Sequence, residues 1–171
     1  MNRKSKVLII VFSFLSGAIF FGLFLPGVFK SKRLFERTTL LGKTPPEFLL
    51  RVNGEKIKLS EIIEREKDKV IIINFFASWC TECREERKKL LELREKAKVI
   101  GVVFQDTEKN IRDYLEELNP YHFVYFDSGE VALDYGITGV PETFVVKDGK
   151  IIKKFIGPIE KEEIEKLISS Q

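Results

Sequence analysis

Hydrophobic positions along this chain first form one unbroken run and then alternate with polar positions in short, element-sized blocks. The run Val7–Leu25 contains no charged residue. As a helix it would span roughly 28 Å, close to the ~30 Å hydrocarbon core of a bilayer. We therefore predict residues 7–29 as a transmembrane signal anchor, after a cytoplasmic tail at 1–6 and before a tether at 30–44. A cleaved signal peptide and a buried helix of a soluble domain are the alternatives, although PGVFK after the run fits a small-x-small cleavage site poorly.

The shorter blocks predict one α/β domain at residues 45–171. Its first elements are strands at 48–52 and 57–59, joined by the hairpin signal Asn53-Gly54, and a helix at 61–67 with Ser60 as its N-cap. The other predicted helices lie at 80–96, 107–118 with Thr107 as the cap, 130–135 and 161–169, and the other strands at 70–76, 99–104, 123–126, 143–147 and 150–156 around Asp148-Gly149. This order predicts a mixed central sheet with helices on both faces.

Composition and charge narrow the possible functions. The chain is 44% hydrophobic and 32% charged, which suits a packed core and excludes a mainly disordered protein. Three basic residues lie among the first six, so the rest has 29 − 3 = 26 Lys and Arg against 26 Asp and Glu. A neutral domain gives nucleic-acid binding no electrostatic support. Two cysteines and one histidine are too few for a four-ligand structural zinc site.

The candidate chemistry lies in Cys80-Thr81-Glu82-Cys83, which follows the buried strand at 70–76. Cysteines at i and i+3 of a first helical turn are close enough for a disulfide. Unpaired N–H groups at the helix start favour the thiolate of Cys80, so we predict Cys80 as the nucleophile and Cys83, one turn further in, as the more buried resolving thiol. Two inert buried cysteines, or half of a metal site, remain alternatives. Arg84 stands where a c-type haem attachment motif needs histidine, which excludes that motif.

Several segments of this sequence resemble the thioredoxin-like proteins. NFFASWCTEC is similar to the family's strand, tryptophan and active-site helix start, and GVPETF is similar to its cis-proline loop. LLGKTPPEFLL and DYGITGVPETFVVKDGKIIKKFIGPI resemble the opening and the C-terminal half of one branch. That branch is the membrane-anchored thiol:disulfide interchange proteins of cytochrome c maturation, the CcmG/DsbE and ResA (TlpA-like) types. The resemblance implies a thioredoxin-like fold with an N-terminal β-hairpin and a central βα insertion at about 99–126.

The resemblance also implies roles for residues around the sulfurs. Trp79 would shield them and help to dock the target, with ordinary core packing as the alternative. Pro141 would follow a cis peptide bond, so that the backbone of Val140 can pair with an extended target; a simple turn proline is the alternative. Asn74 replaces a buried proton-accepting aspartate of thioredoxin. Glu86 would move protons at Cys83.

Three side chains outside the cysteine pair have a structural interpretation beside, or in place of, a chemical one. Glu86 has a second interpretation as a solvated helix charge, like its neighbours Glu85 and Arg87. Glu142 would tune the site and select targets, or be an exposed loop acid. His122 is expected to be an uninvolved surface or packing residue.

Charge near the sulfurs predicts the direction of the reaction. Glu82, Glu85 and Glu86 disfavour a thiolate and raise its pKa, with Arg84 as a partial offset, so the dithiol should give electrons away. We expect an extracytoplasmic protein-disulfide reductase with no metal and no cofactor beyond the Cys80–Cys83 disulfide. The resemblance implies apocytochrome c as the target and a CcdA/DsbD-type membrane thiol reductase as the electron donor. A reductase for other envelope proteins, and a thioredoxin-fold metallochaperone or binding module, are the alternatives.

Overall fold

A computed structural model describes residues 40–52 and 54–169. The predicted tail and anchor, and the tether up to residue 39, lie outside the described residues. Within the described ranges, no helix has the length and apolar character needed to cross a membrane.

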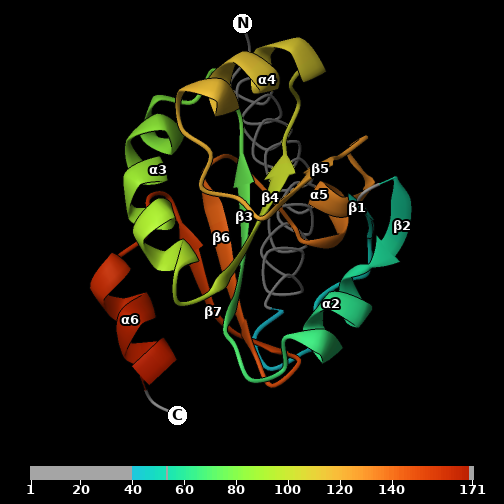
Figure 1. Cartoon of the computed structure of the whole chain (residues 1–171), viewed down its shortest axis with the longest axis vertical. Coiled ribbons are helices and arrows are strands. Elements are labelled where there is room, and N and C mark those ends of the chain that lie inside the picture. The colour runs from blue at the N-terminus through green and yellow to red at the C-terminus, as the bar shows by residue number, and fades with distance from the viewer. Residues whose placement is uncertain (1–39, 53, 170–171) are drawn as a thin grey trace, which may run out of the picture. The chain divides into compact units, whose positions relative to one another are not determined.

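Two sheets organise the domain (Figure 1). A two-stranded antiparallel sheet pairs β1 (Leu49–Val52) with β2 (Glu55–Lys58). The central sheet has the order β5-β4-β3-β6-β7. Its strands are β3 (Ile71–Phe76), β4 (Lys98–Val103), β5 (Phe123–Phe126), β6 (Glu142–Lys147) and β7 (Lys150–Ile156). The pairs β3–β4 and β4–β5 are parallel, and the pairs β3–β6 and β6–β7 are antiparallel, which confirms the predicted mixed sheet.

The middle strand β3 is the most buried element. All six of its side chains are buried, because β4 and β6 flank it and helices cover both faces. Residues that are β-branched or aromatic suit this position, since they pack well on a pleated surface. Asn74 is the single polar side chain in the strand, and its partners form part of the site described below.

Helices lie on both faces of the central sheet (Figure 1). One face carries α3 (Thr81–Arg94), α4 (Glu108–Glu117) and α6 (Lys161–Ser169), whose buried side chains join one hydrophobic cluster. The other face carries α2 (Leu59–Arg65), α5 (Glu130–Asp134) and the β1–β2 hairpin, which share a second cluster. The helix and strand α4–β5 follow β4, as expected for the central insertion, and β5 forms one edge of the sheet.

One glycine of the core is required by an aromatic stack. The ring of Phe76 lies between Tyr114 and Tyr121, with ring centroids 5.6 and 4.5 Å away. A Cβ atom on Gly101 would lie 2.7 Å from the Phe76 ring and 2.9 Å from the Tyr121 ring. Both distances are shorter than real Cβ contacts, so the stack fits against β4 only where that side chain is missing.

The helix α2 begins earlier than predicted. Ser60 is not its N-cap: the cap is Lys58, and Ser60 lies inside the first turn. The reason is tertiary. The free N–H of Leu59 donates to the carbonyl of Phe48, and that of Ser60 to the carboxylate of Glu47, so contacts from the preceding segment replace a serine cap.

Residues 42 and 43, predicted as the end of the tether, bind to the domain. The N–H of Gly42 donates to the carbonyl of Ile151, and the N–H of Ile151 donates to the carbonyl of Lys43. These bonds fix the start of the described chain beside the first residues of β7.

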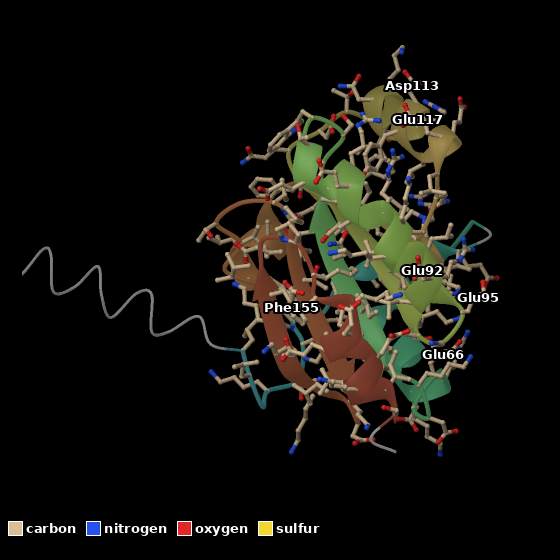
Figure 2. All side chains as sticks on the ribbon, turned by 90° about the vertical axis from the view of Figure 1, so that its left-hand side faces the viewer. Glu66, Glu92, Glu95, Asp113, Glu117 and Phe155 are labelled. Carbon is tan, nitrogen blue, oxygen red and sulfur yellow. A yellow bond between two sulfur atoms is a disulfide. The ribbon has the colours of Figure 1, made fainter. Side chains whose placement is uncertain are left out.

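Charged side chains project from the outer faces of the helices, among them Glu92 of α3 and Asp113 of α4 (Figure 2). Lys161 pairs with Glu92, and Lys109 with Asp113 one helical turn away. Solvent-exposed pairs of this kind each contribute about 1 kcal/mol or less. They contribute little to the stability of the domain, which comes mainly from the two hydrophobic clusters.

Candidate active site

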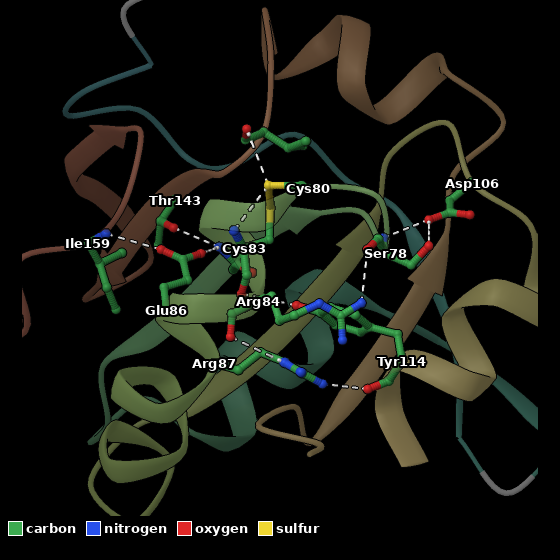
Figure 3. The surroundings of a disulfide bond; sticks show 12 residues. Ser78, Cys80, Cys83, Arg84, Glu86, Arg87, Asp106, Tyr114, Thr143 and Ile159 are labelled. Atoms are coloured by element: carbon green, nitrogen blue, oxygen red, sulfur yellow. Dashed lines mark hydrogen bonds between the residues drawn. A yellow bond between two sulfur atoms is a disulfide. The ribbon is translucent and has the colours of Figure 1, made fainter. Parts of the chain in front are cut away.

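The sulfur pair lies at the start of α3, directly after β3 (Figure 3). Cys80 is the N-cap of the helix with an extended backbone, and Cys83 lies in its first turn. The two sulfurs form a disulfide, with the Cα atoms 5.3 Å apart. The N–H of Cys83 donates to Sγ of Cys80 at 3.0 Å, which stabilises a negative charge on that sulfur in the reduced state.

The two cysteines differ in access to solvent. Cys80 is 7% exposed and Cys83 is 1% exposed, as predicted for a nucleophile and a more deeply placed resolving thiol. Of the two cysteines, Cys80 therefore presents more surface to a target disulfide. The alternative of two equally inert buried cysteines is not supported by this asymmetry.

A loop with a cis proline faces the disulfide. The Val140–Pro141 peptide bond is cis, as the resemblance implied, so Pro141 is not a simple turn proline. The carbonyl oxygen of Val140 lies 3.6 Å from Sγ of Cys80. The carbonyl of Pro141 accepts a hydrogen bond from the N–H of Gly157, which ties this loop to the end of β7.

Glu86 is buried behind the sulfur pair. Its carboxylate is 1% exposed, so the interpretation as a solvated helix charge is wrong. One oxygen accepts from the side-chain amide of Asn74 at 2.8 Å, and the other accepts from the N–H of Ile159 at 3.1 Å (Figure 3). Burial raises the pKa of Glu86 to about 7, although these two hydrogen bonds and the charge of Lys89 oppose the rise.

Asn74 orients this carboxylate through a fully buried network. Its amide also donates to the hydroxyl of Thr143 at 2.9 Å, and its carbonyl oxygen accepts from the hydroxyl of Tyr121 at 2.7 Å. Burial holds the pKa of Tyr121 well above its ordinary value, so this hydroxyl stays a donor. Asn74 thus has a fixed orientation with its amide toward Glu86, and it cannot titrate itself.

Glu142 is buried at the start of β6, so it is not an exposed loop acid. One carboxylate oxygen accepts from the N–H and the hydroxyl of Thr138, both at 2.8 Å, and from the N–H of Gly139 at 3.3 Å. The other lies 2.6 Å from Nζ of Lys154 on β7. The carboxylate therefore fixes the loop that presents Val140 and Pro141.

Trp79 and Glu82 lie at the surface beside Cys80. The tryptophan is 59% exposed, so ordinary core packing does not explain it. Its indole N–H donates to the carbonyl of Gln105 at 3.2 Å. Glu82 is exposed in the first turn of α3, between the two cysteines in sequence.

The expectation that Arg87 is a solvated charge like Glu85 is wrong. Glu85 is exposed, but Arg87 is buried. Its guanidinium stacks over the ring of Tyr114 at 4.1 Å, donates to the carbonyl of Tyr114 and pairs with Glu117 at 2.9 Å. The hydroxyl of Tyr114 in turn donates to the carbonyl of Cys83 at 3.0 Å, so α4 packs directly against the redox helix.

Sequence reasoning missed four residues of this environment: Tyr114, Tyr121, Thr143 and Asp106, whose carboxylate accepts from the N–H and the hydroxyl of Ser78 two residues before Cys80. Each contacts a site residue that is distant in sequence, so no spacing rule marks it. Only Thr143 had a signal, because it lies two residues after Pro141 in the recognised motif.

His122, the one histidine of the sequence, lies just before β5. Its Nδ1 accepts from the N–H of Val99 at 3.1 Å, near the start of β4, and partial burial lowers its pKa. It is a packing residue, as expected. In the described part of the chain, no group of three or more His, Cys, Asp or Glu side chains is placed to hold a metal ion.

A redox disulfide at a helix start, opposite a cis-proline loop on a mixed sheet, defines the class: a thiol-disulfide oxidoreductase with a thioredoxin-like fold. Residues 40–168 match the Redoxin family model, and the chain belongs to that family. It is 36% identical over 135 residues to the thiol:disulfide interchange protein HelX of Rhodobacter capsulatus, covering 77% of this chain and 76% of that protein. It is 30% identical over 173 residues to the thiol-disulfide oxidoreductase ResA of Bacillus anthracis, covering 95% of each.

Solved structures agree on the fold. A thioredoxin-family thiol:disulfide interchange protein from Chlorobium tepidum superposes with a TM-score of 0.63 at 22% identity, covering 75% of this chain and 94% of that one. StoA from Bacillus subtilis superposes with a TM-score of 0.55 at 25% identity, covering 71% and 96%. The predicted fold class of the domain is confirmed.

Proposed function

We propose that this thiol-disulfide oxidoreductase acts as a dithiol reductant outside the cytoplasmic membrane, held there by residues 7–29. Its target is the Cys-x-x-Cys-His disulfide of apocytochrome c, which must be reduced before haem attachment. A membrane thiol reductase of the CcdA/DsbD type returns it to the dithiol state. The family resemblance supports the target, the donor and the location, and the charge-free run Val7–Leu25 supports the anchor.

The observation that carries the direction of electron flow is the buried carboxylate of Glu86 behind Cys83. A negative charge in a site of low dielectric disfavours a nearby thiolate and therefore destabilises the reduced, ionised form. Arg84 does not cancel it, because its guanidinium pairs with Glu117 at 2.6 Å. A dithiol that is poorly stabilised gives its electrons away.

The exchange then follows in two steps. The thiolate of Cys80 attacks one sulfur of the target disulfide, so that a mixed disulfide forms and the other target sulfur leaves as a thiolate. Cys83 loses its proton and attacks Sγ of Cys80, which releases the second target thiolate and leaves the Cys80–Cys83 disulfide. Two electrons pass to the target. With a pKa of about 7, Glu86 is partly ionised at neutral pH and suits the role of acceptor for the Cys83 proton.

The target would dock beside the cis-proline loop. The backbone of Val140 next to Pro141 is available for an extended segment, since proline has no N–H that competes for it. The exposed ring of Trp79 adds apolar contact area. Glu142 holds the cis-proline loop in place by accepting a hydrogen bond from the N–H of Thr138. Glu82, exposed between the cysteines, would tune the pKa of Cys80 upward.

The decisive experiment traps the intermediate. In the full chain, Cys83→Ser removes the resolving thiol, so a mixed disulfide through Cys80 should accumulate with a peptide that contains an oxidised Cys-x-x-Cys-His motif. Cys80→Ser, the matched control, should trap nothing. The wild-type dithiol should reduce the same peptide completely.

Three other results would each contradict one part of the proposed function. Trapping of envelope proteins without this peptide would assign the chain to other targets. A chain that oxidises peptide dithiols but does not reduce the disulfide would reverse the proposed direction. Retained copper binding at the two thiols without any exchange would favour the metallochaperone.

A further inference from the structure

The loop between β4 and α4 runs beside the segment that precedes Cys80. The N–H of Phe104 donates to the carbonyl of Phe76, so the β3–β4 pairing continues one residue past the end of β4. The two loops therefore leave the sheet side by side. At Gln105 the backbone has φ +48°, in the left-handed region, and turns sharply before Asp106.

Asp106 joins these two loops through one carboxylate (Figure 3). One oxygen accepts from the N–H of Ser78 at 2.7 Å and from its hydroxyl at 2.6 Å. The other accepts from the N–H of Thr107 at 2.7 Å and from the side-chain amide of Asn110 at 3.2 Å. Four donors on one carboxylate make a rigid junction, because hydrogen bonds to a charged acceptor are the stronger ones.

A second contact reaches the next residue. The indole N–H of Trp79 donates to the carbonyl of Gln105, the neighbour of Asp106. Both residues immediately before Cys80 are thus held from the same loop. The tryptophan remains 59% exposed, so this contact fixes the ring without covering it.

We propose that Asp106 is a positioning residue for disulfide exchange, which presents Trp79 and Cys80 together to an extended peptide target. This inference rests on the proposed role of Trp79 in docking. Asp106 is not in contact with the sulfurs and moves no proton. It acts by limiting the conformations of Ser78 and Trp79, so that the ring that docks an extended target is already in place beside Cys80, and a small disulfide that does not use this ring depends on it less.

Trp79 gives a direct readout, because it is the one tryptophan of the chain. The test compares the full-length wild type with Asp106→Ala and Asp106→Asn. The control is Asp113→Ala, which removes an exposed carboxylate of α4 that pairs with Lys109 one helical turn away. Circular dichroism identifies a temperature at which every variant is folded, and the other measurements are made at that temperature. Acrylamide quenching of fluorescence reports the freedom of Trp79. Stopped flow gives the second-order rate constants for reduction of a Cys-x-x-Cys-His peptide disulfide and of glutathione disulfide.

With Asp106→Ala, we expect the rate constant for the peptide to fall roughly tenfold and that for glutathione disulfide to fall less than about threefold. Quenching of Trp79 should rise. Asp106→Asn should lie between, because an amide oxygen still accepts from Ser78 but its NH₂ group cannot accept from Thr107. Asp113→Ala should match the wild type within about twofold in all three measurements.

Equal losses for both substrates, or quenching that matches Asp113→Ala, would overturn the inference, since a purely structural role predicts either. If Asp106→Ala does not fold, Ser78→Ala removes one hydroxyl donor and should shift quenching and selectivity in the same direction; no shift would equally overturn it. A wild type that reduces neither substrate refutes the proposed function instead, and the quenching comparison still decides whether Asp106 holds Trp79.

Discussion

Glu86→Gln replaces the buried carboxylate with an amide of the same shape, and it tests the electrostatics of the site through stability. Burial raises the pKa of Glu86 from 4.5 to about 7 in the folded chain. Between these two pH values the folded state holds a proton that the unfolded state has lost. Stability therefore decreases as the pH rises through this window. The difference between the two pKa values corresponds to about 3 kcal/mol.

The amide has a cost of its own that does not depend on pH. Asn74 and Ile159 each direct an N–H at one carboxylate oxygen, so the NH₂ group of glutamine must face one of these donors. A buried polar group without a partner costs about 1–3 kcal/mol. Glu86→Gln should therefore be less stable than the wild type near pH 4.5, and this deficit should close or reverse by pH 8.5.

Urea unfolding of the oxidised chains between pH 4.5 and 8.5 measures this change, because the disulfide keeps the cysteines from titrating. The difference in unfolding free energy between Glu86→Gln and the wild type should shift by about 3 kcal/mol in favour of the variant across the range. Titration of His122 occurs in both chains and cancels. Glu85→Gln, at the exposed neighbouring position, should give a flat difference. If the unfolding free energies of Glu86→Gln and the wild type change in parallel with pH, the assigned ionisation of the buried carboxylate is refuted.

Three further substitutions test the packing around the site, each by urea unfolding at pH 7. Gly101→Ala places a Cβ atom 2.9 Å from the ring of Tyr121, so it should destabilise the chain by about 1–3 kcal/mol; an unchanged midpoint would show that the ring can move aside. Tyr121→Phe removes the donor to the carbonyl oxygen of Asn74, with an expected loss of about 1–3 kcal/mol, and a neutral effect would mean that water replaces the hydroxyl. Lys154→Met leaves a buried oxygen of Glu142 without its cation, so a loss of about 3 kcal/mol or more is expected. That loss should disappear when Glu142 is also changed to Gln, and its persistence would contradict the pairing.

Local signals in the sequence were sufficient for most elements. Thr107 caps α4 as predicted, with its hydroxyl accepting from the N–H of Asn110 at 3.3 Å. Asp148-Gly149 joins β6 to β7, and the strand 123–126 and the helix 161–169 have the predicted bounds. In each case a turn or cap residue lies next to a clear change of hydrophobic period, so neighbouring residues alone specify the boundary.

Contacts between distant segments were not predictable. Arg87 follows Glu86 on a strongly charged helix, and only the position of α4 shows that the carbonyls of Tyr114 and Leu118 receive its guanidinium. Tyr121 is 47 residues from Asn74, and no local pattern joins them. The cysteine pair was recognisable because both sulfurs lie within one helical turn, whereas the partners that bury and orient Glu86 on the same helix come from β3 and from the segment before α6.

The position of Ile151 determines where residues 42 and 43 lie relative to the disulfide. Ile151 pairs with Val146, which pairs with Ile71 at the first residue of β3, whereas Cys80 follows the last residue of that strand. A strand of this length spans about 20 Å. The bonds of Gly42 and Lys43 to Ile151 thus hold these two residues at the end of the sheet remote from the disulfide. The contacts of residues 42 and 43 therefore leave the surface beside Cys80 uncovered, and a target can approach the disulfide without displacing this segment.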